Sequence, residues 1–225
     1  MSTTATATDA VLFDLDGTLI DTRSIYLEAY RRAVEPYLRE DLTPEDIMAL
    51  RPTSEIAFLR AVVPESDFDA CLDGFYRAYQ ALHVGGEPGV FPGVPATLAR
   101  LRRAGAPLGL VTGKSRRSWE ITRAVTDSLE PFDVLVFDDD VRAPKPDPHG
   151  LELALELLRV EPGRAVYVGD TVSDMEAART AGVRPIAALW AHPPEHRDQH
   201  LERVRAVGAT AAERPEALLQ ILALD

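Results

Sequence analysis

The sequence predicts an α/β protein with a doubly wound parallel sheet that is interrupted by an inserted α-helical domain. Two patterns carry this prediction. From residue 94 onward, short apolar runs of strand length alternate with stretches of helical periodicity. Between residues 22 and 84 the pattern changes to helical stripes without a convincing strand. Strands that alternate with helices form a parallel sheet covered on both faces, so we expect one such sheet and one separate helical body.

The predicted elements follow one another in a regular order. The run from Ala10 to Asp14 supplies the first strand and precedes the helical insert. Further strands are expected at 107–112, 133–137, 164–168 and 184–189, and helices near 94–104, 115–127, 147–159 and 172–181. We therefore divide the chain into a core of residues 1–20 and 90–225 and a helical domain of residues 21–89.

The insert itself carries two helical signals and a turn signal. Thr43-Pro44-Glu45-Asp46 indicates a helix start, because an N-cap hydroxyl, a proline at the first helical position and acidic residues in the first turn all favour initiation. Apolar residues then recur at helical spacing at Phe68, Leu72, Phe75, Tyr79 and Leu82. The segment 85–89 is dense in glycine and proline, so we expect a hinge between the two bodies there.

Composition excludes several classes of protein. With 46% hydrophobic and 27% charged residues in 225, the chain can close a sizeable core and is far from the composition of disordered proteins. A net charge of −12 argues against nucleic acid as a partner. The single cysteine, Cys71, cannot form an intramolecular disulfide, and we expect it to pack inside the insert. Neither a signal peptide nor a run of eighteen apolar residues occurs, so we expect no membrane partner and a cytoplasmic location.

Polar side chains follow four of the predicted strands. The first strand runs into Asp14-Leu15-Asp16-Gly17-Thr18, the second into Thr112-Gly113-Lys114-Ser115, the third is followed by Lys145 within Ala143-Pro144-Lys145-Pro146, and the fourth runs into Gly169-Asp170-Thr171-Val172-Ser173-Asp174. The carboxyl ends of parallel strands meet at one rim, where open sheets bind their ligands. Asp14 and Asp16 lie two apart on an extended segment, so both side chains address the same side. The sequence therefore predicts one site at this rim.

The charge balance of this rim predicts a bound cation. Asp14, Asp170, Asp174 and, as a fourth carboxylate, Asp16 are opposed within these motifs by Lys145 alone. Two like charges about 4 Å apart repel by roughly 4 kcal/mol at an effective dielectric constant near 20. Oxygen ligands without histidine or cysteine favour a hard ion, and Mg²⁺ held by one or two carboxylates and a substrate phosphate is the usual solution.

These four motifs, in this order, resemble those of the haloacid dehalogenase-like hydrolase superfamily, and the resemblance covers essentially the whole chain. The insert after the first motif is similar to that family's small α-helical cap. The motifs, together with Phe137-Asp138-Asp139-Asp140-Val141, look closest to phosphoglycolate phosphatases and the related pyrophosphatases. The resemblance implies a Rossmann-like catalytic core and a helical cap domain.

The resemblance also implies a part for each motif residue in the transfer of a phosphoryl group. Asp14 matches the nucleophile that becomes an aspartyl phosphate, and Asp16 matches the general acid and base. Thr112 and the Gly113 amide match the groups that bind the phosphoryl oxygens, and Lys145 matches the cation that neutralises them.

The same resemblance assigns the metal ligands. Asp170, the Asp14 carboxylate and the Asp16 backbone carbonyl would hold Mg²⁺, and Asp174 would support the metal's water shell and Lys145. The implied activity is Mg²⁺-dependent hydrolysis of a small phosphate monoester, with phosphoglycolate as the first candidate.

Alternatives remain open from the sequence. A phosphomutase acting on a sugar phosphate would need the same Asp14 and Asp16, and an inorganic pyrophosphatase would use the same rim. A dehalogenase is disfavoured because those relatives lack an acid at the position of Asp16. A phospho-receiver module, the non-enzyme alternative, leaves no room for the insert. The oligomeric state stays open between monomer and homodimer.

Other polar residues are interpreted more simply. The segment around Lys114 is no phosphate-binding P-loop, because that motif needs glycine where Leu108 stands, and we expect Lys114 to be exposed at a helix start. Asp138, Asp139 and Asp140 are expected in a polar loop. His192, His196 and His200 recur at a spacing that can bind a transition metal, but Pro193 and Pro194 make a helix unlikely at His192, and we expect His196 and His200 on the solvated side of a helix.

Arg51 departs from the family pattern, since the resembling phosphatases often carry glycine in that cap loop. Our hypothesis is that Arg51 reaches an anionic group of the substrate away from the reacting phosphate, with an ordinary surface charge as the alternative.

Overall fold

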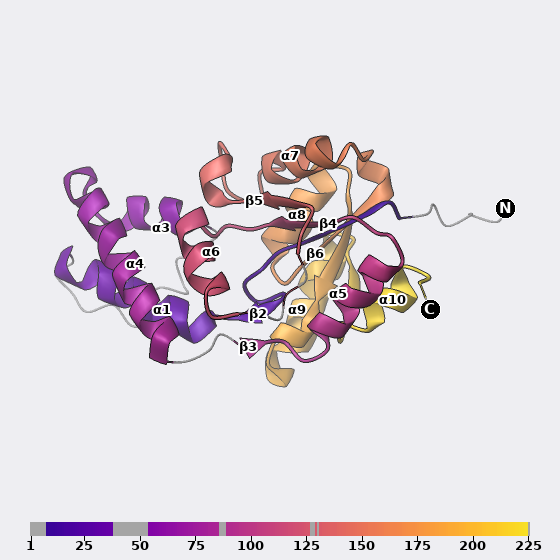
Figure 1. Cartoon of the computed structure of the whole chain (residues 1–225), viewed down its shortest axis with the longest axis horizontal. Coiled ribbons are helices and arrows are strands. Elements are labelled where there is room, and N and C mark those ends of the chain that lie inside the picture. Colours follow the sequence, from indigo (N-terminus) through magenta and orange to yellow (C-terminus); the bar gives the residue numbers. More distant parts are fainter. Residues whose placement is uncertain (1–7, 38–53, 86–88, 127–128, 130, 225) are drawn as a thin grey trace.

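The computed structural model describes residues 8–37, 54–85, 89–126, 129 and 131–224. Figure 1 shows a body that contains a twisted sheet and, beside it along the long axis, a second body made of α1 (Arg23–Val34), α3 (Glu55–Val62) and α4 (Phe68–Gly85). The predicted fold class is confirmed: a parallel sheet flanked by helices carries a helical insertion.

The sheet has six strands, all parallel, in the order β5-β4-β1-β6-β7-β8. Their bounds are β1 (Ala10–Phe13), β4 (Leu108–Val111), β5 (Val134–Val136), β6 (Ala165–Gly169), β7 (Arg184–Ala188) and β8 (Thr210–Ala212). The first five lie within a residue of their predicted bounds. The strand β8 was not predicted, because this short, alanine-rich edge segment lacks the β-branched run that predicts a strand.

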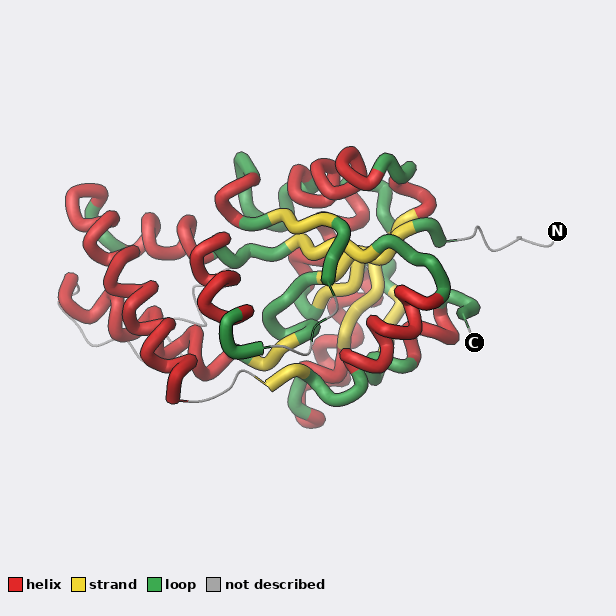
Figure 2. Tube along the Cα trace, viewed as in Figure 1, coloured by secondary structure: helices red, strands yellow, loops and turns green. Residues whose placement is uncertain are grey.

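Helices cover both faces of the sheet (Figure 2). They are α5 (Val94–Arg103), α6 (Arg116–Arg123), α7 (His149–Leu158), α8 (Val172–Thr180), α9 (Pro194–Ala206) and α10 (Ala217–Ile221), with 3₁₀ turns at Glu35–Tyr37, Glu65–Asp67, Asp138–Asp140, Pro162–Arg164 and Leu189–Ala191. Successive side chains of β1 alternate between the faces: Val11 and Phe13 pack with α5 and α10, whereas Ala10 and Leu12 pack with α7 and α8. A strand buried on both faces needs a continuous apolar run, which explains why these strands could be predicted.

The helical insert has its own aromatic core. Tyr30 of α1 stacks on Phe75 of α4 with ring centroids 4.9 Å apart, and it meets Phe58 of α3 at 4.4 Å. The predicted apolar stripe of α4 faces this cluster, and Cys71 is fully buried in it, as expected. The predicted helix start at 43–46 lies outside the described residues.

The two connections between the bodies run side by side. β2 (Ile20–Asp21) pairs antiparallel with β3 (Gly89–Val90), so that Ile20 lies opposite Val90. The predicted domain boundaries fall on this pair, and the central residues of the predicted hinge, 86–88, lie outside the described part of the chain. Among the described residues, no helix combines the length and the apolar character that a membrane span requires.

Candidate active site

The strand order brings the predicted residues to one edge of the sheet. β1 lies between β4 and β6, and Phe13 is in register with both Leu110 and Val168. The residues that follow these strands therefore emerge side by side, at the point where successive connections turn to opposite sides of β1. A cavity of about 470 Å³ opens there between the sheet edge and the helical insert. Its lining includes Asp14, Asp16, Thr112, Gly113, Lys145, Asp170 and Asp174.

Asp14 and Lys145 form the central contact of this cavity. Lys145 Nζ lies 2.8 Å from Asp14 Oδ1 and 2.6 Å from Asp174 Oδ1. Tyr167 is the third acceptor for the ammonium, at 3.0 Å. Burial raises the pKa of Asp14 to about 7, although Lys145 opposes this change. The ammonium thus offsets only part of the cost of burying the carboxylate.

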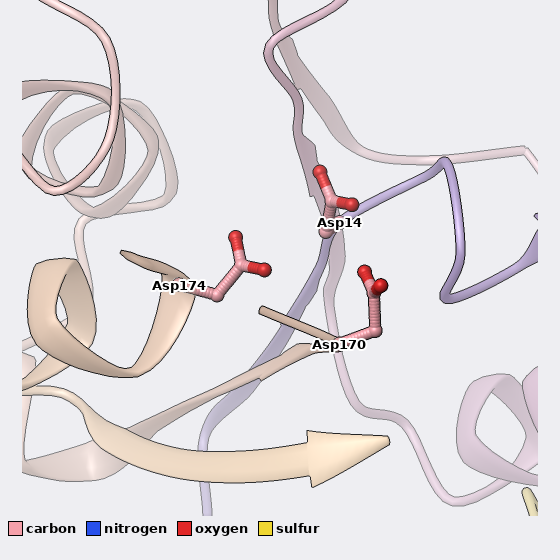
Figure 3. Close-up of side chains that lie close together, drawn as sticks. All are labelled: Asp14, Asp170 and Asp174. Carbon is pink, nitrogen blue, oxygen red and sulfur yellow. The ribbon is translucent and has the colours of Figure 1, made fainter. Parts of the chain in front are cut away.

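Three carboxylates converge at the strand ends. Asp14, Asp170 and Asp174 each offer an oxygen within 4.8 Å of the others, and Figure 3 shows the three side chains gathered at the ends of their strands. The pKa of Asp170 is raised well above its usual range by burial and by the two other carboxylates. An all-oxygen cluster that is short of positive charge fits a hard divalent cation such as Mg²⁺.

Asp174 differs from the other two carboxylates. Its Oδ1 accepts from Lys145 and from the Tyr167 hydroxyl, and its Oδ2 accepts from the Thr171 amide at 2.9 Å. Burial acts to raise its pKa, but Lys145 and Thr171 outweigh burial and the pKa is lowered. With both oxygens engaged, Asp174 is built to hold Lys145 and to cap α8.

Gly17 allows the first loop to approach Asp170 closely. Its backbone has φ +78°, and a Cβ at this position would lie 2.5 Å from Asp170 Oδ2. Only glycine combines this conformation with the missing side chain. The turn Asp16–Gly17 thereby brings the loop after β1 against the tip of β6.

Asp16 lies at the boundary between the two bodies. Its Oδ1 accepts a hydrogen bond from the Thr22 hydroxyl and lies 3.2 Å from Lys114 Nζ. Its side chain keeps 25% of its surface exposed, whereas Lys114 is fully buried. Asp16 is therefore held both by Thr22, at the start of α1, and by Lys114 of the core.

The family assignment rests on a match over most of the chain. Residues 11–188 match the model of the haloacid dehalogenase-like hydrolases. The chain belongs to this family.

Three relatives illustrate the range of haloacid dehalogenase-like hydrolases that this chain resembles. The pyrophosphatase PpaX of Bacillus velezensis is 33% identical over 182 residues, which cover 80% of this chain and 83% of that protein. A Thermotoga maritima structure assigned as a β-phosphoglucomutase is 28% identical, with a TM-score of 0.71 over 96% of this chain and 99% of that one. A Lactobacillus plantarum structure assigned as a phosphoglycolate phosphatase has a TM-score of 0.78 over 96% and 99% of the two chains, and at 24% identity it shows the fold.

The expectation that Lys114 is exposed is wrong for this hydrolase. The residue is 1% exposed, because α1 and α4 of the insert cover it. One signal in the sequence pointed to it: of 24 basic residues only two are lysines, Lys114 and Lys145, and both follow strands. All other Lys or Arg positions are arginine, so both lysines of the chain lie at the buried site.

Two further polar residues are buried, and for His200 this corrects the expectation of a solvated helix face. Asp138 lies in the 3₁₀ turn that follows β5, where a polar loop was expected, and its Oδ2 accepts from the Ser54 hydroxyl at 2.6 Å and from the Ile56 amide at 3.1 Å. The insert thus docks on the strand-end loop. His200 is also buried, because its ring stacks on His192 at 3.8 Å, while His196 is exposed as expected. Arg51 lies outside the described residues.

Proposed function

We propose that this chain is a Mg²⁺-dependent phosphatase that hydrolyses a small phosphate monoester through an aspartyl phosphate. The observation that carries the proposal is a buried carboxylate, Asp14, held by Lys145 in a cavity that Asp16, Thr112 and Asp170 also line. A carboxylate beside an ammonium can approach a phosphate dianion that would otherwise repel it. Membership of the hydrolase family and the names of the relatives support the same reaction class.

In the first step, an oxygen of Asp14 attacks phosphorus and the bond from phosphorus to the ester oxygen breaks. Asp16 gives its proton to that leaving oxygen. The Thr112 hydroxyl and the Gly113 amide donate hydrogen bonds to the phosphoryl oxygens, and Lys145 balances their charge. The products are an alcohol and an aspartyl phosphate at Asp14.

In the second step, water attacks the phosphorus of the aspartyl phosphate. Asp16, now ionised, accepts the proton of this water. The bond between phosphorus and Asp14 breaks, which restores the carboxylate and releases inorganic phosphate. One side chain thus serves as acid and then as base, which requires that it stay within reach of both the leaving oxygen and the water.

Asp14, Asp170 and the Asp16 backbone carbonyl would hold the Mg²⁺ ion. When bound, the ion supplies positive charge to the transferring phosphoryl group. Asp174 contributes from outside this set, because its oxygens already bind Lys145 and Thr171.

The size of the cavity favours a small substrate. The helical insert closes about 470 Å³ over the carboxylates with side chains that include Tyr26, Tyr30 and Glu55. Phosphoglycolate is our first candidate, and we keep the proposal that Arg51 binds an anionic group remote from the reacting phosphate. Pyrophosphate is the second candidate, because the Bacillus velezensis relative is named a pyrophosphatase. A phosphomutase that acts on a sugar phosphate is the third candidate, because the Thermotoga maritima structure is assigned as a β-phosphoglucomutase.

A panel of phosphate esters and pyrophosphate, incubated with the purified chain, tests these candidates. We expect phosphoglycolate to release inorganic phosphate in the presence of Mg²⁺ and to lose this release when EDTA is added. Release from pyrophosphate alone would replace the first candidate by the second. Conversion of a sugar phosphate into its isomer without free phosphate would identify a mutase, and phosphate release that EDTA does not affect would contradict the metal assignment.

A further inference from the structure

Lys114 is a buried ammonium that the proposed reaction does not use. Its Nζ lies 3.2 Å from Asp16 Oδ1, and its side chain has no exposed surface. It is 88 residues from Tyr26, whose hydroxyl accepts a hydrogen bond from it at 2.9 Å. Burying an ammonium away from water is costly unless specific partners compensate its charge, and one of these partners is Asp16, the proposed acid and base.

The helical insert supplies the other partners. Tyr26 of α1 and Tyr79 of α4 both accept hydrogen bonds from the ammonium, and their ring centroids lie 4.3 and 4.7 Å from Nζ. An ammonium has three protons, and the two hydroxyls accept two of them, while Asp16 Oδ1 forms an ion pair with Nζ at 3.2 Å. The position of the ammonium beside Asp16 is therefore set by the insert.

Glu55 connects this group to the loop that carries Lys114. Its Oε1 accepts from the Tyr26 hydroxyl, and its Oε2 accepts from the Ser115 amide at 3.0 Å. Its own amide donates to the Gly113 carbonyl at 3.2 Å. The start of α3 thus binds on both sides of Lys114, so docking of the insert and placement of the ammonium occur together.

The contact leaves one oxygen of Asp16 for chemistry. Thr22 and Lys114 both address Oδ1. Among the residues that the structure describes, none donates a hydrogen bond to Oδ2, whereas Oδ1 accepts one from Thr22. Holding one oxygen fixes the orientation of the carboxylate, and the other stays available for proton transfer.

Resting on the proposed function above, we propose that Lys114 is a positioning residue for Asp16, and that the insert residues Tyr26, Tyr79 and Glu55 hold it in place. Proton transfer then depends on the insert being docked. Lys114 itself touches neither the nucleophile nor the phosphoryl group. Its removal should impair the steps that need Asp16 and spare the attack by Asp14.

Leaving groups of different quality separate these steps. Release of 2,4-dinitrophenolate needs no proton, so the first turnover with 2,4-dinitrophenyl phosphate measures attack by Asp14 alone. We expect Lys114→Met to keep this first-turnover rate within about 3-fold. Its steady-state turnover on this ester and on phosphoglycolate should fall by about 10- to 100-fold, less than the 10²- to 10⁴-fold contribution of a general acid or base. On the dinitrophenyl ester KM should fall together with kcat, because attack is unchanged while hydrolysis of the aspartyl phosphate is slowed.

A double-variant comparison shows whether the effect passes through Asp16. In an Asp16→Asn background, Lys114→Met should change the residual turnover by less than about 2-fold. Equal losses with and without Asp16, or a first turnover that falls as much as the steady state, would overturn the proposal. Tyr79→Phe should show a weaker form of the Lys114→Met pattern. Tyr76→Phe is the matched control, because Tyr76 lies on the same helix and its hydroxyl bonds Ser115 instead, at 3.1 Å.

A second measurement needs no activity and no Lys114 variant. Because the chain has two lysines, isotopic labelling of lysine side chains gives two sets of NMR signals. Asp16→Asn and Tyr79→Phe should shift the Lys114 signal, and Tyr76→Phe should leave it in place. A Lys114 signal that none of these variants moves would disprove the contact. If no ester is hydrolysed, the proposed function fails, while this measurement still decides where Lys114 is bound.

Discussion

Lys145 Nζ lies 2.8 Å from Asp14 Oδ1, although 131 residues separate the two in the chain. This contact joins the tip of β1 to the loop after β5. Among the described residues, Lys145 is the only cation that contacts Asp14. Burial nevertheless raises the pKa of Asp14 to about 7. Lys145 therefore fixes the position of the Asp14 carboxylate but offsets only part of the cost of burying its charge. A divalent ion can supply the remaining positive charge.

Asp14→Asn should abolish turnover while preserving the fold. The amide has the shape of the carboxylate but cannot form the acyl phosphate, so we expect turnover to fall by at least about 10³-fold, as for other nucleophiles. The free energy of unfolding should change by less than about 1 kcal/mol, because Lys145 keeps Asp174 as a partner. Phosphate release and urea unfolding measure the two quantities. A variant that retains a tenth of the turnover would refute the nucleophile assignment.

Gly17→Ala should disturb the metal site, and Gly105→Ala is its matched control. Both glycines have φ near +80°, at +78° and +81°, but only at Gly17 would a Cβ collide with Asp170, while at Gly105 nothing lies within 4 Å. We expect Gly105→Ala to cost about 1 kcal/mol of strain and Gly17→Ala at least about 1 kcal/mol more. Calorimetric titration with Mg²⁺ should show weaker binding for Gly17→Ala alone. Equal behaviour of the two variants would mean that the loop can move away from Asp170.

The stability of the chain should fall in mild acid through His200. Burial, followed by His192 and Arg203, lowers the pKa of this ring to about 4, below the value near 6.5 of an unfolded histidine. Between these values the unfolded state binds more protons, so stability is lost as the pH falls from about 6.5 toward 4. At pH 5 the loss amounts to about 2 kcal/mol.

A comparison of the free energy of unfolding of the native chain with that of His200→Gln, between pH 7.5 and pH 5, tests this effect. The difference between the two curves should shrink by about 2 kcal/mol over this range. His196→Gln, at an exposed position on the same helix, should run parallel to the native curve. Parallel curves for His200→Gln would show that this ring carries no such coupling.

Cys71 should react with alkylating reagents only when the insert unfolds. The thiol is fully buried, its Sγ contacts the Ala33 carbonyl at 3.3 Å, and burial raises its pKa to about 11. Both the low access and the scarcity of thiolate slow the reaction, so we expect iodoacetamide at pH 8 to label the folded chain at least about 100-fold more slowly than the chain in guanidinium chloride. Mass spectrometry follows the labelling. Rapid labelling of the folded chain would show that the insert opens readily on its own.

The sheet and its rim of polar residues could be predicted because their signals are local. Each strand is an apolar run followed by a turn, and the parallel order places Asp14, Thr112 and Asp170 at one edge whatever the detailed packing. The strand β8 escaped prediction since three edge residues rich in alanine carry too little pattern.

The surroundings of Lys114 and Asp138 could not be predicted in the same way. Gly113-Lys114-Ser115 has the local pattern of an exposed helix start, and Ser115 does cap α6. What buries Lys114 is Tyr26 and Tyr79, which come from another body of the molecule. The scarcity of lysine in the composition singles out Lys114 as unusual, but it does not indicate which residues contact it.

Hydrophobic periodicity and chain order were thus enough to determine which strands form, that they run parallel, and which acidic and basic side chains stand at their ends. Only the tertiary structure decided which residues of the insert close over those ends. Contacts such as Glu55 with Ser115, 60 residues apart, depend on how two separately packed bodies are oriented. No local pattern encodes that orientation, because it results from the sum of many side-chain contacts across the interface.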